Sequence, residues 1–224
     1  MQALDGVIVR DLGRVDYLAT WRAMREFTER RDPSTNDEIW LLMHPRVYTI
    51  GLKGRDHEFV SRDGISFVRT DRGGDMTYHG PGQIVAYVLM DLQRRRWGVR
   101  QLVHGLEQAV IELLVEQGIE GHRRCGAPGV YVEDKKIAAL GLRVRRGRSY
   151  HGLALNVDMD LTPFAAIDPC GYPGMDVTQL LALAPHLNIE QTNQLLMSHL
   201  ITSLGYNAFD VDSEQPTPKP ASGY

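Results

Sequence analysis

The sequence predicts a single α+β domain built on a largely antiparallel sheet. Three observations support this class: long helical patterns, a series of short apolar strands, and tight polar turns between consecutive strands late in the chain. The 224 residues suffice for one sizeable core, and neither an internal repeat nor a linker divides them. We expect one domain over residues 1–209 and a disordered tail over 210–224, which is rich in Pro and Ser.

The first half of the chain predicts one helix and four strands. The helix covers residues 16–31, where large apolar residues recur at helical spacing, at Tyr17, Trp21, Met24 and Phe27. Three short strands follow, read from EIWLLMHP, which Pro45 ends, from VYTIG and from ISFVRT. The stretch IVAYVLM, residues 84–90, is apolar without alternation, as expected for a strand covered on both faces.

The second half predicts two helices around an antiparallel meander. The clearest helix covers residues 98–117, with apolar residues at i, i+3 and i+4, and Gly118 supplies its C-terminal stop. The strands GVYVE, KIAALGLRV and SYHGLALNV are separated by short polar turns, at 134–135 and 145–148. A last helix is predicted over about 189–204.

The composition is that of an ordinary cytoplasmic globular protein. The net charge of −3 favours neither nucleic acid nor an anionic membrane as a partner. Asp5 and Arg10 interrupt the N-terminal segment, so we expect no signal peptide, and no apolar stretch approaches the ~18 residues that a membrane span needs. The two cysteines are too few for a disulfide scaffold and lack the spacing of a metal site, so we expect no metal.

A glycine-rich stretch, RGGDMTYHGPGQ, begins at Arg72 and ends at Gln83 between two predicted strands. Four glycines in twelve residues let the backbone approach a ligand closely and leave N–H donors exposed. The alternative is a long hairpin loop whose glycines only turn corners. The stretch matches neither a P-loop nor a dinucleotide-binding fingerprint.

Lys136 opens the strand KIAALGLRV, directly after a tight turn. Alternation with a period of two would place it on one face with Ala138, Leu140 and Leu142. The small residues Ala138, Ala139 and Gly141 leave room beside this strand for a ligand. The alternative is a lysine that reaches solvent from the end of a strand.

Cys170 lies in IDPCGYPG, where prolines and glycines predict a loop. A free thiol has a pKa of about 8.5, so a nucleophilic cysteine needs a neighbouring cation. The candidates are Lys136, His79 and His151. The alternative is an inert, buried thiol, and Cys125, in RRCGAPG, also lies on a predicted loop, so these arguments alone barely separate the two cysteines.

Together, three stretches resemble the lipoyl(octanoyl) transferase family: RGGDMTYHGPGQ, GVYVEDKKIAALGLRVRRGRSYHGLALNVDMDL and DPCGYPGMDVTQL. The resemblance runs from about residue 6 to 205. It implies the catalytic-domain fold of biotin and lipoate protein ligases, a mixed sheet flanked by helices, so that residues 1–209 would form an octanoyltransferase catalytic domain. It also implies transfer of an octanoyl group from octanoyl-acyl carrier protein to a lysine of lipoyl domains, in 2-oxoacid dehydrogenase complexes and the glycine cleavage H protein. No cofactor is implied.

The resemblance also assigns roles to residues. Cys170 would carry the octanoyl group as a thioester, and Lys136 would favour its thiolate and move protons, whereas Cys125 has no role. The substrate-contacting positions would be Arg72, Gly73, Gly74, Asp75, Met76, Thr77, Tyr78, His79, Ala139, Leu140, Gly141, Gly152, Leu153 and Ala154. Val88 and Pro173 depart from the usual family residues, which affects loop geometry rather than chemistry.

Two other functions are alternatives to this one. An ATP-dependent lipoate or biotin ligase shares the fold, but it needs no loop cysteine, and its motifs differ from the His-Gly-Pro-Gly-Gln that starts at His79. A carrier-binding module without activity would need neither Cys170 nor Lys136. The arginines at 94–96 and at 143, 145, 146 and 148 are candidates for docking an acidic carrier, with solvated turns as the alternative.

Overall fold

The computed structural model describes residues 6–54, 64–167 and 176–212. Its main feature is an eight-stranded sheet in the order β11-β1-β2-β6-β10-β9-β8-β7. β1 is parallel to both β2 and β11, and the other neighbouring pairs are antiparallel. The strands are β1 (Gly6–Arg14), β2 (Asp37–Met43), β6 (Gln83–Leu89), β7 (Gly121–His122), β8 (Gly129–Val132), β9 (Lys135–Arg145), β10 (Arg148–Asn156) and β11 (Ala208–Asp212).

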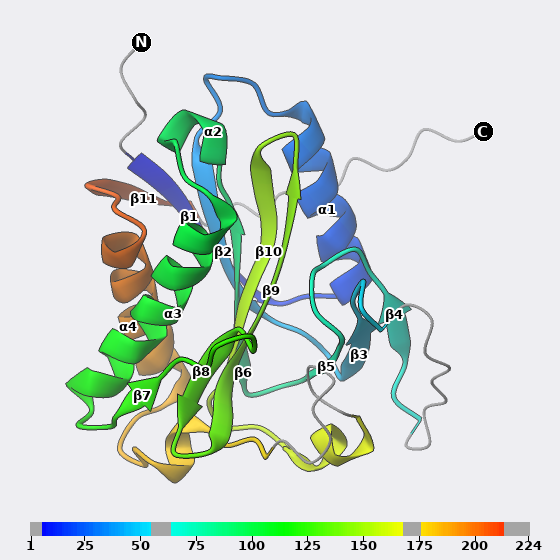
Figure 1. Ribbon diagram of the computed structural model, residues 1–224, viewed down its shortest axis with the longest axis vertical. Helices are drawn as coiled ribbons and strands as arrows, with labels where there is room; N and C mark the ends of the chain where they lie inside the picture. The colour runs from blue at the N-terminus through cyan, green and yellow to red at the C-terminus, as the bar shows by residue number, and fades with distance from the viewer. Residues whose placement is uncertain (1–5, 55–63, 168–175, 213–224) are drawn as a thin grey trace.

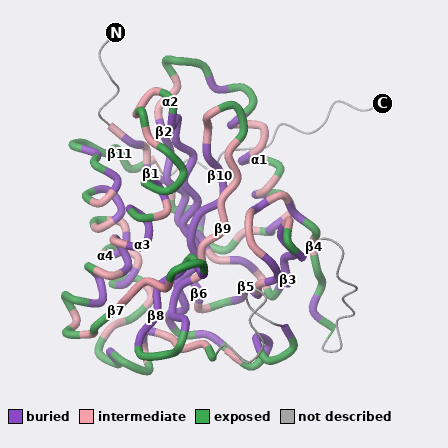
Figure 2. The backbone as a smooth tube through the Cα atoms, in the orientation of Figure 1, coloured by how far each residue is buried: buried purple, intermediate pink, exposed green. Residues whose placement is uncertain are grey.

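Helices cover both faces of this sheet, so its central strands are buried (Figures 1 and 2). The helices α3 (Val99–Glu116) and α4 (Ile189–Ser203) pack on one face, and α1 (Tyr17–Arg30) packs on the other. Asp16 caps α1 by accepting the N–H of Ala19 at 2.9 Å. The three predicted helices and the mixed, largely antiparallel sheet are thus confirmed.

A three-stranded sheet lies beside the central one, near the start of α1 (Figure 1). Its order is β4-β3-β5, with β4 (Phe67–Arg69), β3 (Val47–Ile50) and β5 (Met76–His79). The turn η1 (Thr162–Ala166) packs against it, and Tyr48, Tyr78 and Phe164 form part of their common core. The remaining short elements are α2 (Leu92–Arg95) and η3 (Leu180–Ala182).

Four strands were not predicted from the sequence, and one of them, β7, is only two residues long. β5 lies inside the glycine-rich stretch, which we expected to be a loop. β1 alternates buried Val7 and Val9 with more exposed residues, but charged residues dominate its second half. β11 is an exposed edge strand that reaches Asp212, past the domain boundary expected at residue 209. Residues 213–224 of the expected tail lie outside the described residues.

A buried carboxylate ties several elements together at the end of the sheet away from Lys136. Asp37, at the start of β2, accepts hydrogen bonds from Arg31 and Arg94, each at 2.6 Å. The hydroxyl of Tyr206 and the backbone N–H of Asp91 also donate to it, at 3.0 and 2.8 Å. Asp37 and Arg31 are almost inaccessible to solvent, so this group fixes the positions of α1, β2, α2 and the end of α4.

Candidate active site

A one-residue irregularity in β9 sets the direction of Lys136. Val130 of β8 lies opposite Ala138, whereas the next residue, Tyr131, lies opposite Lys136, so Ile137 is an extra residue in β9. Ile137 and Ala138 both belong to the core under α3 and α4, while Lys136 lines a pocket beside the small sheet. A β-bulge of this kind re-aims the neighbouring side chain.

Because of this bulge, Lys136 does not follow the alternation expected from the sequence. Ala138, Leu140 and Leu142 pack with the core under α3 and α4, as alternation requires. Lys136 does not share their face but lines the pocket with Ala139 and Gly141. The expectation for Ala138 as a pocket residue is also wrong, because its side chain lies in that core.

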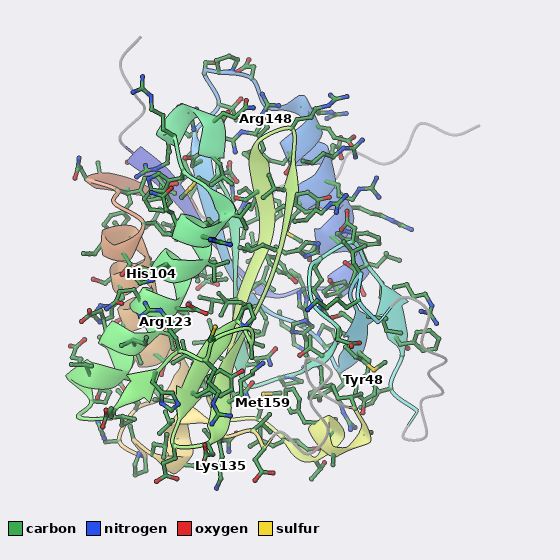
Figure 3. The ribbon with its side chains drawn as sticks, in the orientation of Figure 1. Tyr48, His104, Arg123, Lys135, Arg148 and Met159 are labelled. Carbon is green, nitrogen blue, oxygen red and sulfur yellow. The ribbon has the colours of Figure 1, made fainter. Side chains whose placement is uncertain are left out.

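Lys136 is buried, whereas its neighbour Lys135 is exposed at the turn. The ammonium of Lys136 lies 5.3 Å from the centre of the Tyr131 ring, within the range of a cation–π contact. The hydroxyl of Tyr131 donates to the carbonyl of Ala127 at 3.0 Å, which holds the ring in place. Lys135 marks the lower end of the β9–β10 hairpin in Figure 3.

The pocket lies between the small sheet and the face of the central sheet that carries α1. Its empty space is about 700 Å³ when the open mouth is included. Residues from all three motif stretches meet there, although they are far apart in sequence, and Val177 is the one from the third stretch. The predicted residues in its lining are Arg72, Gly74, Asp75, Met76, Thr77, His79, Lys136, Ala139, Leu140, Gly141, Gly152, Leu153 and Ala154.

Two predicted residues lie elsewhere. Gly73 lines a neighbouring cavity and donates its N–H to the carbonyl of Leu142 at 2.8 Å, so it joins the glycine-rich loop to β9. Tyr78 is buried in the core of the small sheet. Cys170 lies outside the described residues, and Cys125 is exposed.

Two of the glycines allow close approaches of the backbone. A Cβ on Gly141 would lie 3.1 Å from both the Arg72 side chain and the carbonyl of Gly73, so the glycine-rich loop would have to move away from β9 by a few tenths of an ångström. A Cβ on Gly152 would lie 2.0 Å from the carbonyl of Ala86. Gly152 therefore serves the pairing of β10 with β6, and the space for a ligand comes from Gly141, Ala139 and Ala154.

Polar side chains that the sequence analysis did not select also line this pocket or support it. His44 donates from Nδ1 to the carbonyl of Val15 at 2.8 Å, and its Nε2 accepts from the Tyr87 hydroxyl at 2.7 Å. Tyr17 stacks on His79, with ring centres 5.8 Å apart. Tyr17 and Tyr87 are pocket residues that no motif marks in the sequence, since they come from a helix and a strand that read as core.

His151 has an unusual backbone and a carboxylate partner. Its φ of 61° lies in the left-handed region, which non-glycine residues adopt at a cost in free energy. Its Nε2 lies 3.1 Å from Asp71 Oδ1, which also accepts from Trp21 Nε1 at 2.9 Å, and the Tyr150 hydroxyl donates to the other oxygen. Burial opposes ionisation of Asp71, but these hydrogen bonds outweigh it and lower its pKa.

The surroundings of His79, His151 and Lys136 determine which of these three side chains could be the cation that lowers the pKa of a thiol. Burial lowers the pKa of His79 to about 3, and burial also lowers the pKa of His151 despite the nearby carboxylate. Both imidazoles are therefore neutral near pH 7. Tyr150, which also binds Asp71, has its pKa raised to about 12, mainly by burial and secondly by this hydrogen bond. Lys136 remains as the candidate.

Acidification is expected to destabilise the protein through its buried histidines. The pKa values of His44 and His79 are lowered from 6.5 to about 4 and about 3, mainly by burial. Below about pH 6.5 the unfolded chain binds protons that the folded chain does not, so the free energy of unfolding falls as pH decreases toward 4. Denaturant unfolding at about pH 7.5 and about pH 5 measures this change.

The variant His44→Asn provides the control for this prediction. It removes one group that titrates only in the unfolded chain, so the loss of stability between the two pH values should be smaller than in the parent. An equal loss in both proteins would show that His44 does not contribute.

The described residues hold no cluster of three or more His, Cys, Asp or Glu side chains that could bind a metal ion. Within the same ranges, no helix has the length and apolar character needed to cross a bilayer.

The chain is similar to known proteins both in sequence and in fold. The chain matches the model of the lipoyl protein ligase A/B catalytic domain over residues 16–201. The octanoyltransferase of Thiobacillus denitrificans is 58% identical over 194 residues, 87% of this chain and 89% of that protein. The octanoyltransferase of Nitrosococcus oceani is 53% identical over 204 residues, 91% of each chain.

Solved structures show the same fold at low sequence identity. A crystal structure of lipoate-protein ligase A bound with ATP has a TM-score of 0.77 and 16% identity, covering 93% of this chain and 88% of that one. Biotin protein ligase from Aquifex aeolicus has a TM-score of 0.51 and 12% identity, covering 89% of this chain and 68% of that one. The expected fold is confirmed, and at these identities the likeness concerns the fold alone.

Proposed function

We propose, because the chain belongs to the lipoyl protein ligase A/B catalytic-domain family, that it transfers an octanoyl group from acyl carrier protein to a lysine of lipoyl domains through a thioester on Cys170. The lipoyl domains of 2-oxoacid dehydrogenase complexes and the glycine cleavage H protein are the proposed acceptors. The observation that carries the proposal is the pocket in which the glycine-rich stretch meets β9 and β10 beside the buried Lys136.

In the first step, the Cys170 thiolate attacks the thioester carbonyl of the donor. A carbon–sulfur bond to Cys170 forms, the bond to the carrier's sulfur breaks, and the leaving thiolate takes a proton from the Lys136 ammonium. An ammonium beside the thiol favours the thiolate, which is the reactive form. The bulge in β9 supports this role, since it places Lys136 in the pocket rather than in the core.

In the second step, the amine of the acceptor lysine attacks the Cys170 thioester. An amide forms, the thiolate of Cys170 leaves, and the proton lost by the amine passes to Lys136. Exchange of one thioester for another is nearly isoenergetic, and conversion of a thioester to an amide is favourable, so neither step needs ATP. Backbone N–H groups of the glycine-rich stretch are candidates for stabilising the oxyanion.

The lining of the pocket suits an unbranched apolar chain. Its walls are the small residues Ala139, Gly141 and Ala154 together with Val85 and Leu153, and the imidazoles of His79 and His151 are neutral. Burial of the chain would contribute about 0.8 kcal/mol per methylene. The neutral imidazoles avoid the cost of placing a charge beside that chain, and the charged residues of the lining are Arg72, Asp75 and Lys136.

Filling the pocket is expected to change the preferred chain length. In Ala139→Leu the larger side chain occupies part of the space along β9, so kcat/KM for an octanoyl donor should fall at least about tenfold, with a smaller loss for a hexanoyl donor. Steady-state transfer with both donors measures the ratio. The same change at Ala182, which is exposed in η3, is the control. Equal losses for both donors in Ala139→Leu would contradict a chain bound along this wall.

Intact-protein mass measurement with octanoyl-acyl carrier protein, in the absence of ATP, tests the proposed function. We expect one octanoyl adduct on the parent chain and none on Cys170→Ala. A ligase would instead form octanoyl-adenylate from octanoate and ATP and show no adduct. Absence of the adduct, together with adenylate formation when octanoate and ATP are supplied, would show that the protein is an ATP-dependent ligase. This is the second function that the fold allows.

The arginine clusters differ as docking candidates. Arg94 binds Asp37, and Arg95 donates to the carbonyl of Leu204 at 2.7 Å, so both have partners within the fold. Arg145 and Arg148 lie at the β9–β10 turn, and Figure 3 shows Arg148 and Lys135 at opposite ends of this hairpin. Since the 11 residues of β9 span about 35 Å, a carrier docked at this turn would be far from Lys136. The turn is therefore a weak candidate.

A further inference from the structure

A line of buried side chains connects the glycine-rich stretch with the backbone at Lys136. His79 Nδ1 lies 2.7 Å from Gln83 Oε1, and Gln83 Nε2 donates to Asn156 Oδ1 at 2.9 Å. Asn156 Nδ2 in turn donates to the carbonyl of Thr178 at 3.0 Å. His79, Gln83 and Asn156 are all at least nine-tenths buried. The line therefore has little competition from water for its hydrogen bonds.

The direction of every bond in this line follows from its last acceptor. A backbone carbonyl can only accept, so Asn156 must present its NH₂ group to Thr178 and its oxygen to Gln83. Gln83 must then donate to Asn156 and accept from His79, which therefore carries its proton on Nδ1. A second bond from Gln83 Nε2 to the carbonyl of Tyr78, at 3.3 Å, agrees with this orientation.

The far end of the line holds the segment that pairs with Lys136. The N–H of Lys136 donates to the carbonyl of Asp176 at 2.9 Å, and the N–H of Thr178 donates to the carbonyl of Lys136 at 3.0 Å. Val177 thus forms a parallel bridge with Lys136. The side chain of Asn156 fixes the carbonyl of Thr178 from the neighbouring strand β10, while it also lines the pocket.

We propose that Asn156 is a positioning residue for Lys136, acting through the backbone of Thr178 and supported by Gln83. The proposal rests on the proposed function, because it concerns the placement of the ammonium for acyl transfer. β9 is irregular at this point, so the pairing with Asp176 and Thr178 adds to that of Tyr131 in defining the backbone from which the Lys136 side chain starts. A displacement of about 1 Å at a reacting group can reduce a rate by about a hundredfold.

The test compares Asn156→Ala with Asn207→Ala, an identical change at an exposed position, both in a Cys125→Ser background so that Cys170 is the remaining thiol. Three quantities are measured: the rate of octanoyl-adduct formation, the pH profile of Cys170 alkylation by iodoacetamide, and the melting temperature. For Asn156→Ala we expect adduct formation to slow about tenfold or more and the alkylation midpoint to move to higher pH. Asn207→Ala should match the parent in both.

Gln83→Met is a second variant, at a residue that does not line the pocket. In this variant too we expect slower adduct formation and a higher alkylation midpoint, but with smaller changes than in Asn156→Ala. It carries the test if Asn156→Ala does not fold. Unchanged adduct rate and alkylation profile in these variants would overturn the proposal. So would a lower melting temperature with an unchanged alkylation profile, since that would show a purely structural role.

Failure of the proposed function gives a different pattern. In that case the parent forms no octanoyl adduct, whereas the alkylation profile still reports whether Asn156 affects the surroundings of the thiol. A profile that also stays the same in Lys136→Met would mean that Lys136 does not act on the thiol, and the positioning proposal would fall with it.

Discussion

Replacing Lys136 by methionine is expected to slow formation of the octanoyl-enzyme by about 10²–10⁴-fold, the usual contribution of a positioned acid or base. Methionine keeps an unbranched apolar side chain of similar length over the Tyr131 ring but removes the ammonium. Rapid mixing with octanoyl-acyl carrier protein, followed by intact-protein mass measurement, gives the rate.

The adjacent lysine provides a matched control. Lys135 is exposed at the turn before β9, so Lys135→Met should change the same rate by no more than about twofold. Equal rates in Lys136→Met and the parent would rule out a role for this ammonium in acyl transfer. Equal losses in the two variants would point to an effect on the turn instead.

Replacing Asp37 by asparagine should cause the largest loss of stability, about 3–5 kcal/mol in the free energy of unfolding. The change keeps the shape of the side chain but leaves the guanidinium groups of Arg31 and Arg94 without their carboxylate. Arg31 is inaccessible to solvent, so water cannot take the place of the missing charge. For a protein of this size the melting temperature should fall by roughly 6–20 °C.

Asp134→Asn is the control for this prediction. Asp134 pairs with Arg124 at an exposed turn, and such pairs contribute about 1 kcal/mol at most. Denaturant unfolding of both variants compares the two sites. A loss below about 1 kcal/mol for Asp37→Asn would mean that the two arginines find other partners.

Hydrophobic periodicity was sufficient to predict the parts of the fold that bury long apolar faces. The helices α1, α3 and α4 agree with their predicted ranges to within about two residues. The strands β9 and β10 agree with theirs equally well. The missed strands β1 and β11 lack such a signal, because they lie at one edge of the sheet and carry charged residues. Their pairing depends on parallel neighbours that are distant in sequence.

The candidate site could be predicted in composition but not in arrangement. Glycine content and the motif stretches selected most of the residues that line the pocket. Tyr17, Tyr87 and Asn156 were not selected, since a single polar residue in an apolar segment reads as part of the core until its neighbours in space are known. The direction of Lys136 depends on the register of β8 against β9, which periodicity along one strand does not contain.

The extra residue Ile137 has a consequence for how this family could lose activity. Insertion of one residue between Val130 and Tyr131 would give Ile137 a partner in β8 and allow regular pairing, and Lys136 would then share the face of Ala138, toward the core under α3 and α4. The lysine would still be present in the sequence, preceded by the same turn. The site is therefore encoded by the number of residues between two points of the hairpin as well as by their identities. A comparison that scores substitutions alone would miss an insertion that inactivates the protein.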